Sequence, residues 1–119
     1  MVRVGDGTLF RVATMANSKY AANTAAARAR RIEAGAYVRS LRLKQNLTQL
    51  DLANKLGFAY YTFVSQVEGG KSRIPPDRML DWANHLGVDG QLFSRKMLKF
   101  YDPHMFQAIF PYDEKLSVL

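Results

Sequence analysis

TQLDLANKLGFAYYTFVSQVEGGK, the stretch from Thr48 to Lys71, predicts two short helices joined by a turn that is centred on a glycine. Thr48 and Asp51 have the spacing of a capping box, in which each side chain accepts the backbone N–H of the other residue and a helix begins. Gly57 predicts the end of this helix, because glycine adopts a left-handed backbone without penalty. We expect the second helix to span Tyr60–Glu68.

The second of these helices has one apolar side and one polar side. Val64 and Val67 are three residues apart, so they share a face and predict its buried side. Four residues project together from the opposite side, and we call them the reading face: Tyr61, Thr62, Ser65 and Gln66. A hydrogen-bonding set of this kind suits the edges of bases in the major groove of DNA, and a glutamine such as Gln66 can pair with adenine through two hydrogen bonds.

The positive charge of the chain is concentrated near its beginning. The net charge is +7 over 119 residues. Up to Lys44 there are nine basic residues against two acidic ones, whereas eight basic and eight acidic residues follow. A basic block attracts polyanions, and DNA binding gains affinity from the counterions that neutralised phosphates release. A membrane surface would attract the same block, so charge alone leaves both partners open.

Several functions lack the residues that they require. No stretch approaches the roughly 20 apolar residues of a transmembrane helix, and no signal-peptide pattern is visible. The chain has no cysteine, and neither His85 nor His104 has a second ligand at metal-binding spacing. No phosphate-binding glycine loop, carboxylate pair or activated nucleophile is present. We therefore expect a non-enzymatic protein that uses no cofactor or metal. We also expect it in the cytoplasm, and the family resemblance given below implies that it is bacterial or phage-derived and associated with the nucleoid.

Helical spacing and chain breakers divide the rest of the sequence. Residues 1–34 are rich in alanine and arginine and predict a basic arm that is partly disordered or helical. We expect a domain over residues 35–101, whose first helix spans Ala36–Gln45. A fourth helix begins at the prolines near residue 75, and a fifth has Asp89 as its N-cap. Residues 102–119 form an apolar extension.

The end of the fifth helix and the extension carry many large apolar side chains: Phe100, Tyr101, Met105, Phe106, Ile109 and Phe110. Leaving this area in water is unfavourable, at roughly 25 cal/mol per Å². Folding back on the bundle, a homodimer interface and a docking site for another protein would each cover it. We favour folding back together with dimerisation.

Residues from about Ala36 to Asp89 resemble the XRE family of helix-turn-helix proteins, which includes the lambda repressor and Cro type. The resemblance rests on VRSLRLKQNLTQ at 38–49, LANKLG at 52–57, VEGGK at 67–71 and HLGVD at 85–89. The family fold is a compact bundle of four or five helices, of which the third lies in the major groove. The resemblance therefore implies an all-α, compact five-helix bundle, preceded by the basic arm and followed by an aromatic helical extension.

The resemblance also implies roles for individual residues. Gln49 takes the place of the family's phosphate clamp at the start of the second helix. Lys71 and Arg73 match the loop that touches the DNA backbone after the third helix. Arg42 and Glu68 fall where the family often places a partly buried ion pair between the first and third helices. The base-reading positions of the family fall on Tyr61, Thr62 and Gln66, with Ser65 near them.

The chain departs from the family in one place. Between Gly57 and Glu68 it is one residue longer than the common spacing, so the extra residue lies in the turn or early in the third helix. The register of Tyr60, Tyr61 and Thr62 depends on which of these holds. The directions of Ser65 and Gln66 do not depend on the position of the extra residue, because helix geometry fixes them relative to the buried valines.

The leading interpretation is a sequence-specific transcription regulator that binds double-stranded DNA as a homodimer. Two copies spaced by one turn of DNA raise the affinity and select a two-fold symmetric site. We expect Arg28, Arg30 and Arg31 of the arm to add phosphate contacts. The alternative is a protein-binding adaptor on the same scaffold, either antitoxin-like or recruiting RNA polymerase or a second regulator through the extension.

Overall fold

The first helix of the structure is much longer than the sequence predicts. The structure is a computed structural model that describes the backbone of residues 7–112 and the side chains of residues 24–112. Helix α1 spans Gly7–Lys44 and passes without a break through the predicted boundary between arm and domain, because alanine and arginine favour helix. Outside the described residues lie the first six residues of the arm and the last seven of the extension.

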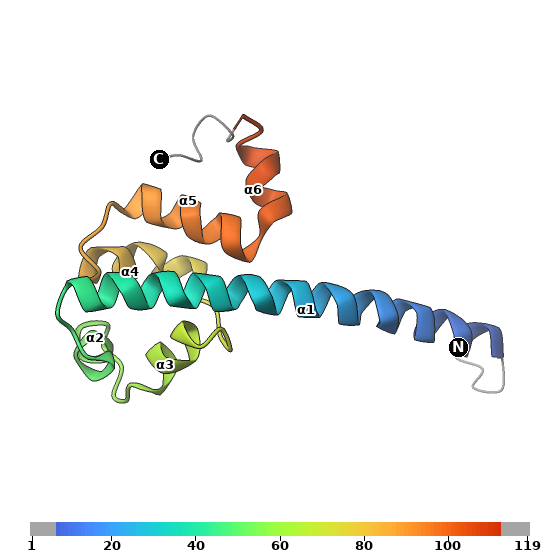
Figure 1. Cartoon of the computed structure of the whole chain (residues 1–119), viewed down its shortest axis with the longest axis horizontal. Coiled ribbons are helices and arrows are strands. Elements are labelled where there is room, and N and C mark those ends of the chain that lie inside the picture. The colour runs from blue at the N-terminus through green and yellow to red at the C-terminus, as the bar shows by residue number, and fades with distance from the viewer. Residues whose placement is uncertain (1–6, 113–119) are drawn as a thin grey trace.

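Helix α1 runs through the middle of the fold, with helices on two sides of it. On one side lie α2 (Gln49–Lys55) and α3 (Thr62–Glu68), as Figure 1 shows. On the other side lie the 3-10 turn η1 (Pro76–Arg78), α4 (Met79–His85), α5 (Gly90–Tyr101) and α6 (Pro103–Ile109). Over residues 7–112 the fold is therefore all-helical and has six α-helices. The sequence predicts five helices followed by a helical extension, and α6 lies in that extension.

The predicted start and end of α2 are confirmed. Thr48 Oγ1 accepts the backbone N–H of Asp51 at 3.0 Å, and Asp51 Oδ2 accepts that of Thr48 at 2.9 Å. These hydrogen bonds hold the pKa of the Asp51 carboxyl below its ordinary value. Gly57 follows the helix with a φ of 84°. The chain therefore leaves α2 through the left-handed turn that the sequence predicts.

Helix α3 begins at Thr62, two residues later than predicted, with Tyr61 as its N-cap. Tyr60 and Tyr61 therefore belong to the turn, and the residue that this chain has in excess of the family spacing lies there. An aromatic chain packs the turn against α4. The ring centroids of Phe58 and Phe63 are 5.5 Å apart, and those of Phe63 and Trp82 are 6.2 Å apart. With these rings inside, Tyr60 is left 76% exposed.

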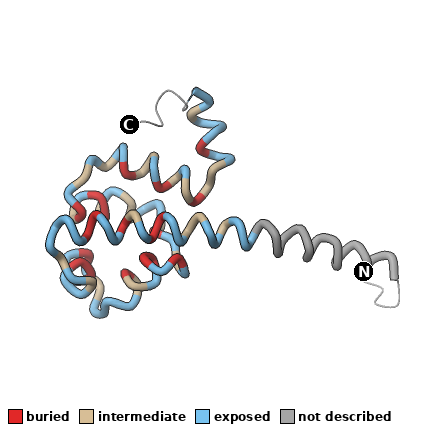
Figure 2. The backbone as a smooth tube through the Cα atoms, viewed as in Figure 1, coloured by how far each residue is buried: buried red, intermediate tan, exposed pale blue. Residues whose placement is uncertain are grey.

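The core lies where α1 meets the other helices, as the buried positions in Figure 2 show. Val64 and Val67 are fully buried, which confirms the predicted inner side of α3. Trp82 is likewise fully buried and supplies the largest side chain of the core. The 3-10 turn η1 stands where the sequence predicts the first turn of the fourth helix. Pro75 just before it has the extended backbone of an N-cap, with a ψ of 143°.

Two of the six residues predicted for a dimer or partner contact are covered within the chain, one at the end of α5 and one in the extension. Tyr101 and Phe106 are buried within the chain itself. The Tyr101 hydroxyl accepts the backbone N–H of Ile74 at 3.2 Å, and the Phe106 ring lies 5.1 Å from that of Phe110. Folding back covers these residues because α6 packs against α5. Phe100 and Phe110 are half-buried, whereas Met105 and Ile109 stay exposed.

Candidate nucleic-acid interface

The reading face lies on the outer side of α3. Tyr61, Thr62 and Gln66 are exposed and Ser65 is half-buried, while the valines on the opposite side of the helix have no exposed surface. Ser72 Oγ lies 3.3 Å from Gln66 Oε1 and donates a hydrogen bond to it. The loop after α3 therefore steadies the carbonyl oxygen of the side chain that we consider best suited to read adenine.

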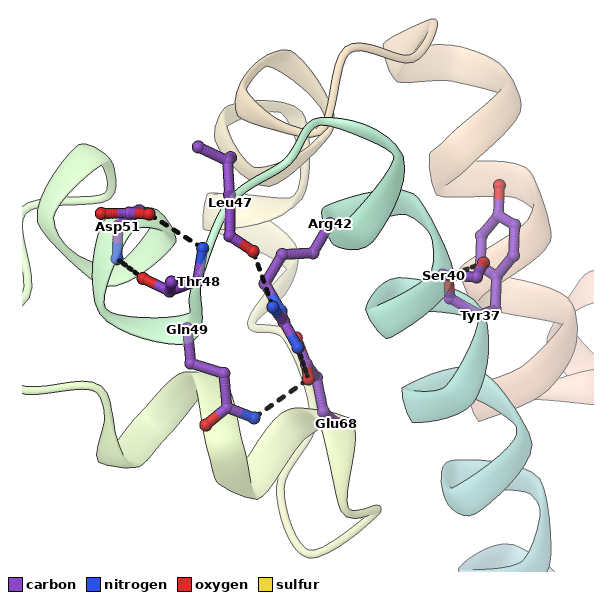
Figure 3. Close-up of polar contacts among 8 residues, drawn as sticks. All are labelled: Tyr37, Ser40, Arg42, Leu47, Thr48, Gln49, Asp51 and Glu68. Atoms are coloured by element: carbon purple, nitrogen blue, oxygen red, sulfur yellow. Dashed lines mark hydrogen bonds and ion pairs between the residues drawn. The ribbon is translucent and has the colours of Figure 1, made fainter.

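A buried ion pair ties α3 to α1. Arg42 donates to Glu68 through Nε at 2.6 Å and through Nη2 at 3.0 Å, and the two side chains are only 7% and 3% exposed. Arg42 Nη1 also donates to the carbonyl oxygen of Leu47 at 2.7 Å. Figure 3 shows that Gln49 joins this group from α2, with its Nε2 3.0 Å from Glu68 Oε1. One carboxylate thus connects three helices.

A glycine allows α1 and α3 to approach each other closely. A Cβ atom added to Gly35 would lie 2.2 Å from the carbonyl oxygen of Glu68 and 2.6 Å from that of Val67. One turn earlier, Arg31 Nε donates to the carbonyl oxygen of Gly70 at 3.1 Å. The side of α1 that carries Gly35 therefore rests on the last turn of α3 and on the loop that follows it.

The three arginines predicted for the arm do not share one side of α1. Arg31 and Arg28 lie four and seven residues before Gly35, so they face the α3 side. Arg30 lies seven residues before Tyr37, whose ring is 6.1 Å from the rings of Phe93 and Phe100 on α5. Seven residues are about two helical turns, so Arg30 faces the α5 side. Arg30 is therefore not placed for a phosphate contact beside α3.

The two basic residues of the loop after α3 differ in their surroundings. Lys71 is exposed, and its backbone N–H donates to the carbonyl oxygen of Gln66 at 2.9 Å, which holds the loop against α3. Arg73 instead forms an ion pair with Asp102, and its guanidinium carbon lies 4.7 Å from the centroid of the Tyr101 ring. A phosphate contact by Arg73 would have to compete with this pair, whereas Lys71 meets no such competition from a carboxylate in the described structure.

Comparison with known families agrees with this arrangement. The family model described as Helix-turn-helix matches residues 38–93. This segment belongs to the helix-turn-helix family. The resemblance to the XRE and lambda repressor type is thereby confirmed, and the domain is that of a DNA-binding regulator. No curated protein and no solved structure matches the chain.

One basic residue beside the helix-turn-helix reading face was missing from the predicted set. Arg39 is exposed and lies four residues after Gly35, so it points to the α3 side of α1. The sequence held a signal for it, because Arg39 precedes Arg42 by three residues and therefore shares its face. Three arginines of α1 thus flank the helix-turn-helix on the α3 side: Arg28, Arg31 and Arg39.

The described residues provide no support for two other kinds of site. None of their helices is both long enough and apolar enough to cross a membrane. Among the same residues, no group of three or more histidine, aspartate or glutamate side chains is placed to hold a metal ion.

Proposed function

We propose that this chain is a sequence-specific transcription regulator that binds double-stranded DNA with α3 in the major groove. One observation carries the proposal. Helix α3 buries both of its valines and exposes Thr62 and Gln66, and its N-cap Tyr61 is exposed as well. Exposed donors and acceptors on a helix with a fully packed back suit direct reading of base edges. The family membership of the segment supports the same conclusion.

The charges around α3 fit the DNA backbone. Arg28, Arg31 and Arg39 lie on the α3 side of α1, and Lys71 is exposed in the loop after α3. Positive side chains in these places neutralise phosphates and set the orientation of the protein on the duplex. We place the protein at promoters in the bacterial or phage-infected cytoplasm, associated with the nucleoid.

The proposed function is tested by selecting bound sequences from a pool of random duplexes. For the selected duplex, Gln66→Ala should cost about 1–3 kcal/mol and relax the preference at one base pair. Lys71→Ala should weaken binding to all sequences alike, because a phosphate contact carries no sequence information. Affinities of both variants on the selected duplex and on its single-base variants measure the difference.

A matched control is Gln91→Ala, because Gln91 is an exposed glutamine on α5, across α1 from α3. This change should leave both affinity and base preference intact. A pool in which no sequence becomes enriched would disprove sequence-specific binding. An unchanged base preference in Gln66→Ala would show that the reading face is wrongly assigned.

We further propose that the regulator binds as a homodimer through the exposed part of the extension. Met105 and Ile109 are 55% and 53% exposed on α6, and because they are four residues apart they lie on the same face of the helix. A dimer would give the selected duplex two-fold symmetry. Sedimentation of the protein alone and with duplex should give two chains per site, and one chain per site would contradict the dimer.

A second candidate function is that of an adaptor that binds another protein. An apolar groove between the start of α4 and the end of α5 favours it, with Ile74, Met79, Leu80, Leu98 and Tyr101 in its lining. Its partner would be RNA polymerase, a second regulator or a toxin. A protein that binds no duplex but purifies with one stoichiometric partner would support this alternative against DNA binding.

A further inference from the structure

We propose that Glu68 is a positioning residue, which together with Arg42 fixes the amide of Gln49 in one orientation for its contact with DNA. The inference deepens the proposed function and rests on it. Glu68 Oε1 accepts from Arg42 Nη2 and from Gln49 Nε2, both at 3.0 Å, and Glu68 Oε2 accepts from Arg42 Nε at 2.6 Å. Both carboxylate oxygens are therefore committed as acceptors.

The chemistry of these groups determines the orientation of the amide. A guanidinium has donors only, so the carboxylate atoms that face it must accept. The same oxygen, Glu68 Oε1, then also requires a donor from Gln49, and only the amide nitrogen supplies one. The carbonyl oxygen of Gln49 consequently points away from Glu68, as Figure 3 shows. Which atom of the amide is nitrogen is thus fixed by the hydrogen bonds themselves.

Burial keeps this arrangement in place. The side chains of Arg42 and Glu68 are almost entirely inside the protein, and a third donor from Arg42 holds the carbonyl of Leu47 just before α2. Gln49 is half-exposed and is the first residue of α2. Its amide therefore has one edge fixed by the core and one edge at the surface.

The consequence concerns the phosphate contact of Gln49. A phosphate oxygen is an acceptor and needs an N–H group, and Nε2 keeps a second N–H after its bond to Glu68. The amide of an exposed glutamine without a fixed partner would flip between two orientations, one with its oxygen and one with its nitrogen toward the solvent. The Glu68 carboxylate selects one orientation in the unbound protein, so the entropy cost of ordering the Gln49 side chain does not have to be met on DNA binding.

A double-mutant cycle on the selected duplex tests the inference. Gln49→Ala should weaken binding on the order of tenfold, as expected for one hydrogen bond to a charged group. Glu68→Gln should weaken it by a similar factor, because its single carbonyl oxygen replaces the two carboxylate oxygens that accept three donors from Arg42 and Gln49, so the Gln49 amide is held less firmly. In the Gln49→Ala background, Glu68→Gln should add less than about a twofold loss, since neighbouring residues that act through each other are not additive. Full additivity of the two losses would overturn the inference.

Glu33→Gln is the matched control, because it removes one carboxylate from an exposed position of α1. Any change that it causes in affinity should be the same with and without Gln49→Ala. Amide hydrogen exchange of wild-type protein without DNA gives a second test that needs no variant. One Nε2 proton of Gln49 should exchange on the order of tenfold more slowly than those of exposed Gln91.

Equal exchange at Gln49 and Gln91 would overturn the inference even if Glu68→Gln fails to fold. The exchange measurement also separates this inference from the proposed function. A chain that selects no duplex but protects Gln49 would refute DNA reading while leaving the orientation of the amide established.

Discussion

A contact at a single residue sets the distance between α1 and α3. Gly35 lets α1 rest on the carbonyl groups at the end of α3, where any side chain would overlap them. The close approach brings Arg42 within bonding distance of Glu68, and it also places Arg31 on the loop after α3. The position of the reading face relative to the basic side of α1 therefore depends on one missing methyl group.

Gly35→Ala should destabilise the fold and weaken DNA binding. Overpacking costs about 1–3 kcal/mol, which exceeds the gain of at most about 1 kcal/mol that alanine brings to a helix. The free energy of unfolding in urea and the affinity for the selected duplex measure both effects. Gly69→Ala is the control, because its added Cβ would have its nearest neighbour at 3.3 Å. Equal stability of the two variants would contradict the tight contact.

The capping box should make the free energy of unfolding depend on pH in the acid range. Hydrogen bonds with Thr48 lower the pKa of Asp51 from its ordinary 3.8. A carboxyl whose pKa is lowered by folding contributes stability that is complete above the unfolded pKa and is lost as the pH falls through the folded one. Asp51→Asn should therefore reduce the loss of stability below about pH 4. Urea unfolding at a series of pH values measures it, and an unchanged acid dependence would exclude Asp51 as its source.

At the scale of helices, the extension combines an inner and an outer side. Phe106 is buried against the bundle, whereas Met105, the residue before it, is exposed. Helix α6 therefore serves the stability of the monomer with one side and offers apolar surface with the other. The two roles lie on adjacent residues and can be separated by substitution.

Phe106→Ala should lower the free energy of unfolding by roughly 3 kcal/mol, as removal of a buried aromatic ring does. Met105→Ala should change it by no more than about 0.5 kcal/mol, because the side chain is exposed. Thermal or urea unfolding compares the two, and sedimentation shows whether Met105→Ala weakens the dimer. A larger loss of stability from Met105→Ala would place the inner side of α6 elsewhere.

Local signals in the sequence were sufficient for the short helices. The capping box at Thr48, the turn at Gly57 and the paired valines of α3 each depend on residues a few positions apart, and the structure confirms all three. The start of α3 could not be predicted in the same way. It depends on edge-to-face contacts of Phe58 with Phe63 and of Phe63 with Trp82, which lies in the following α-helix.

The surroundings of several predicted site residues depend on contacts between distant segments, so the sequence alone could not predict them. The Arg42–Glu68 pair came from the resemblance and is confirmed. The opposite directions of Arg28 and Arg30 follow only when it is known that Gly35 meets α3 and Tyr37 meets α5. The pairing of Arg73 with Asp102 required the fold of the extension. From the sequence, all of these basic residues were predicted to contact phosphates, Arg28 and Arg30 because of the charge of the arm and Arg73 because of the family resemblance.

The whole molecule presents two different sides across α1. The α3 side carries the reading face and the arginines of α1 that face it, whereas Arg30 faces the side on which α5 lies (Figure 1). The arginines of α1 at positions 28 to 39 are therefore divided between a side proposed to meet DNA and a side turned away from it. The salt dependence of binding distinguishes the two.

Arg28→Gln and Arg31→Gln should each flatten the plot of log affinity against log salt concentration by about 0.9, the change expected for one lost phosphate contact. Arg30→Gln should leave the slope unchanged, although it removes the same charge from a position two residues away. Titrations of the selected duplex over a range of salt concentrations give the three slopes. Equal slopes for all three variants would mean that the salt dependence of binding follows the net charge of the protein and not the position of each arginine.

The buried ion pair between Arg42 and Glu68 also limits which substitutions evolution can accept at these two positions. Loss of either partner leaves a lone charge inside the protein, which costs about 3–5 kcal/mol out of a typical total of about 5–15 kcal/mol for a domain. Replacement of both residues by apolar residues of similar volume can leave the stability of the fold unchanged or raise it. If the two substitutions occur one after the other, however, the intermediate protein carries an unpaired buried charge and is strongly destabilised. Descendants of this gene should therefore keep both positions or exchange them together.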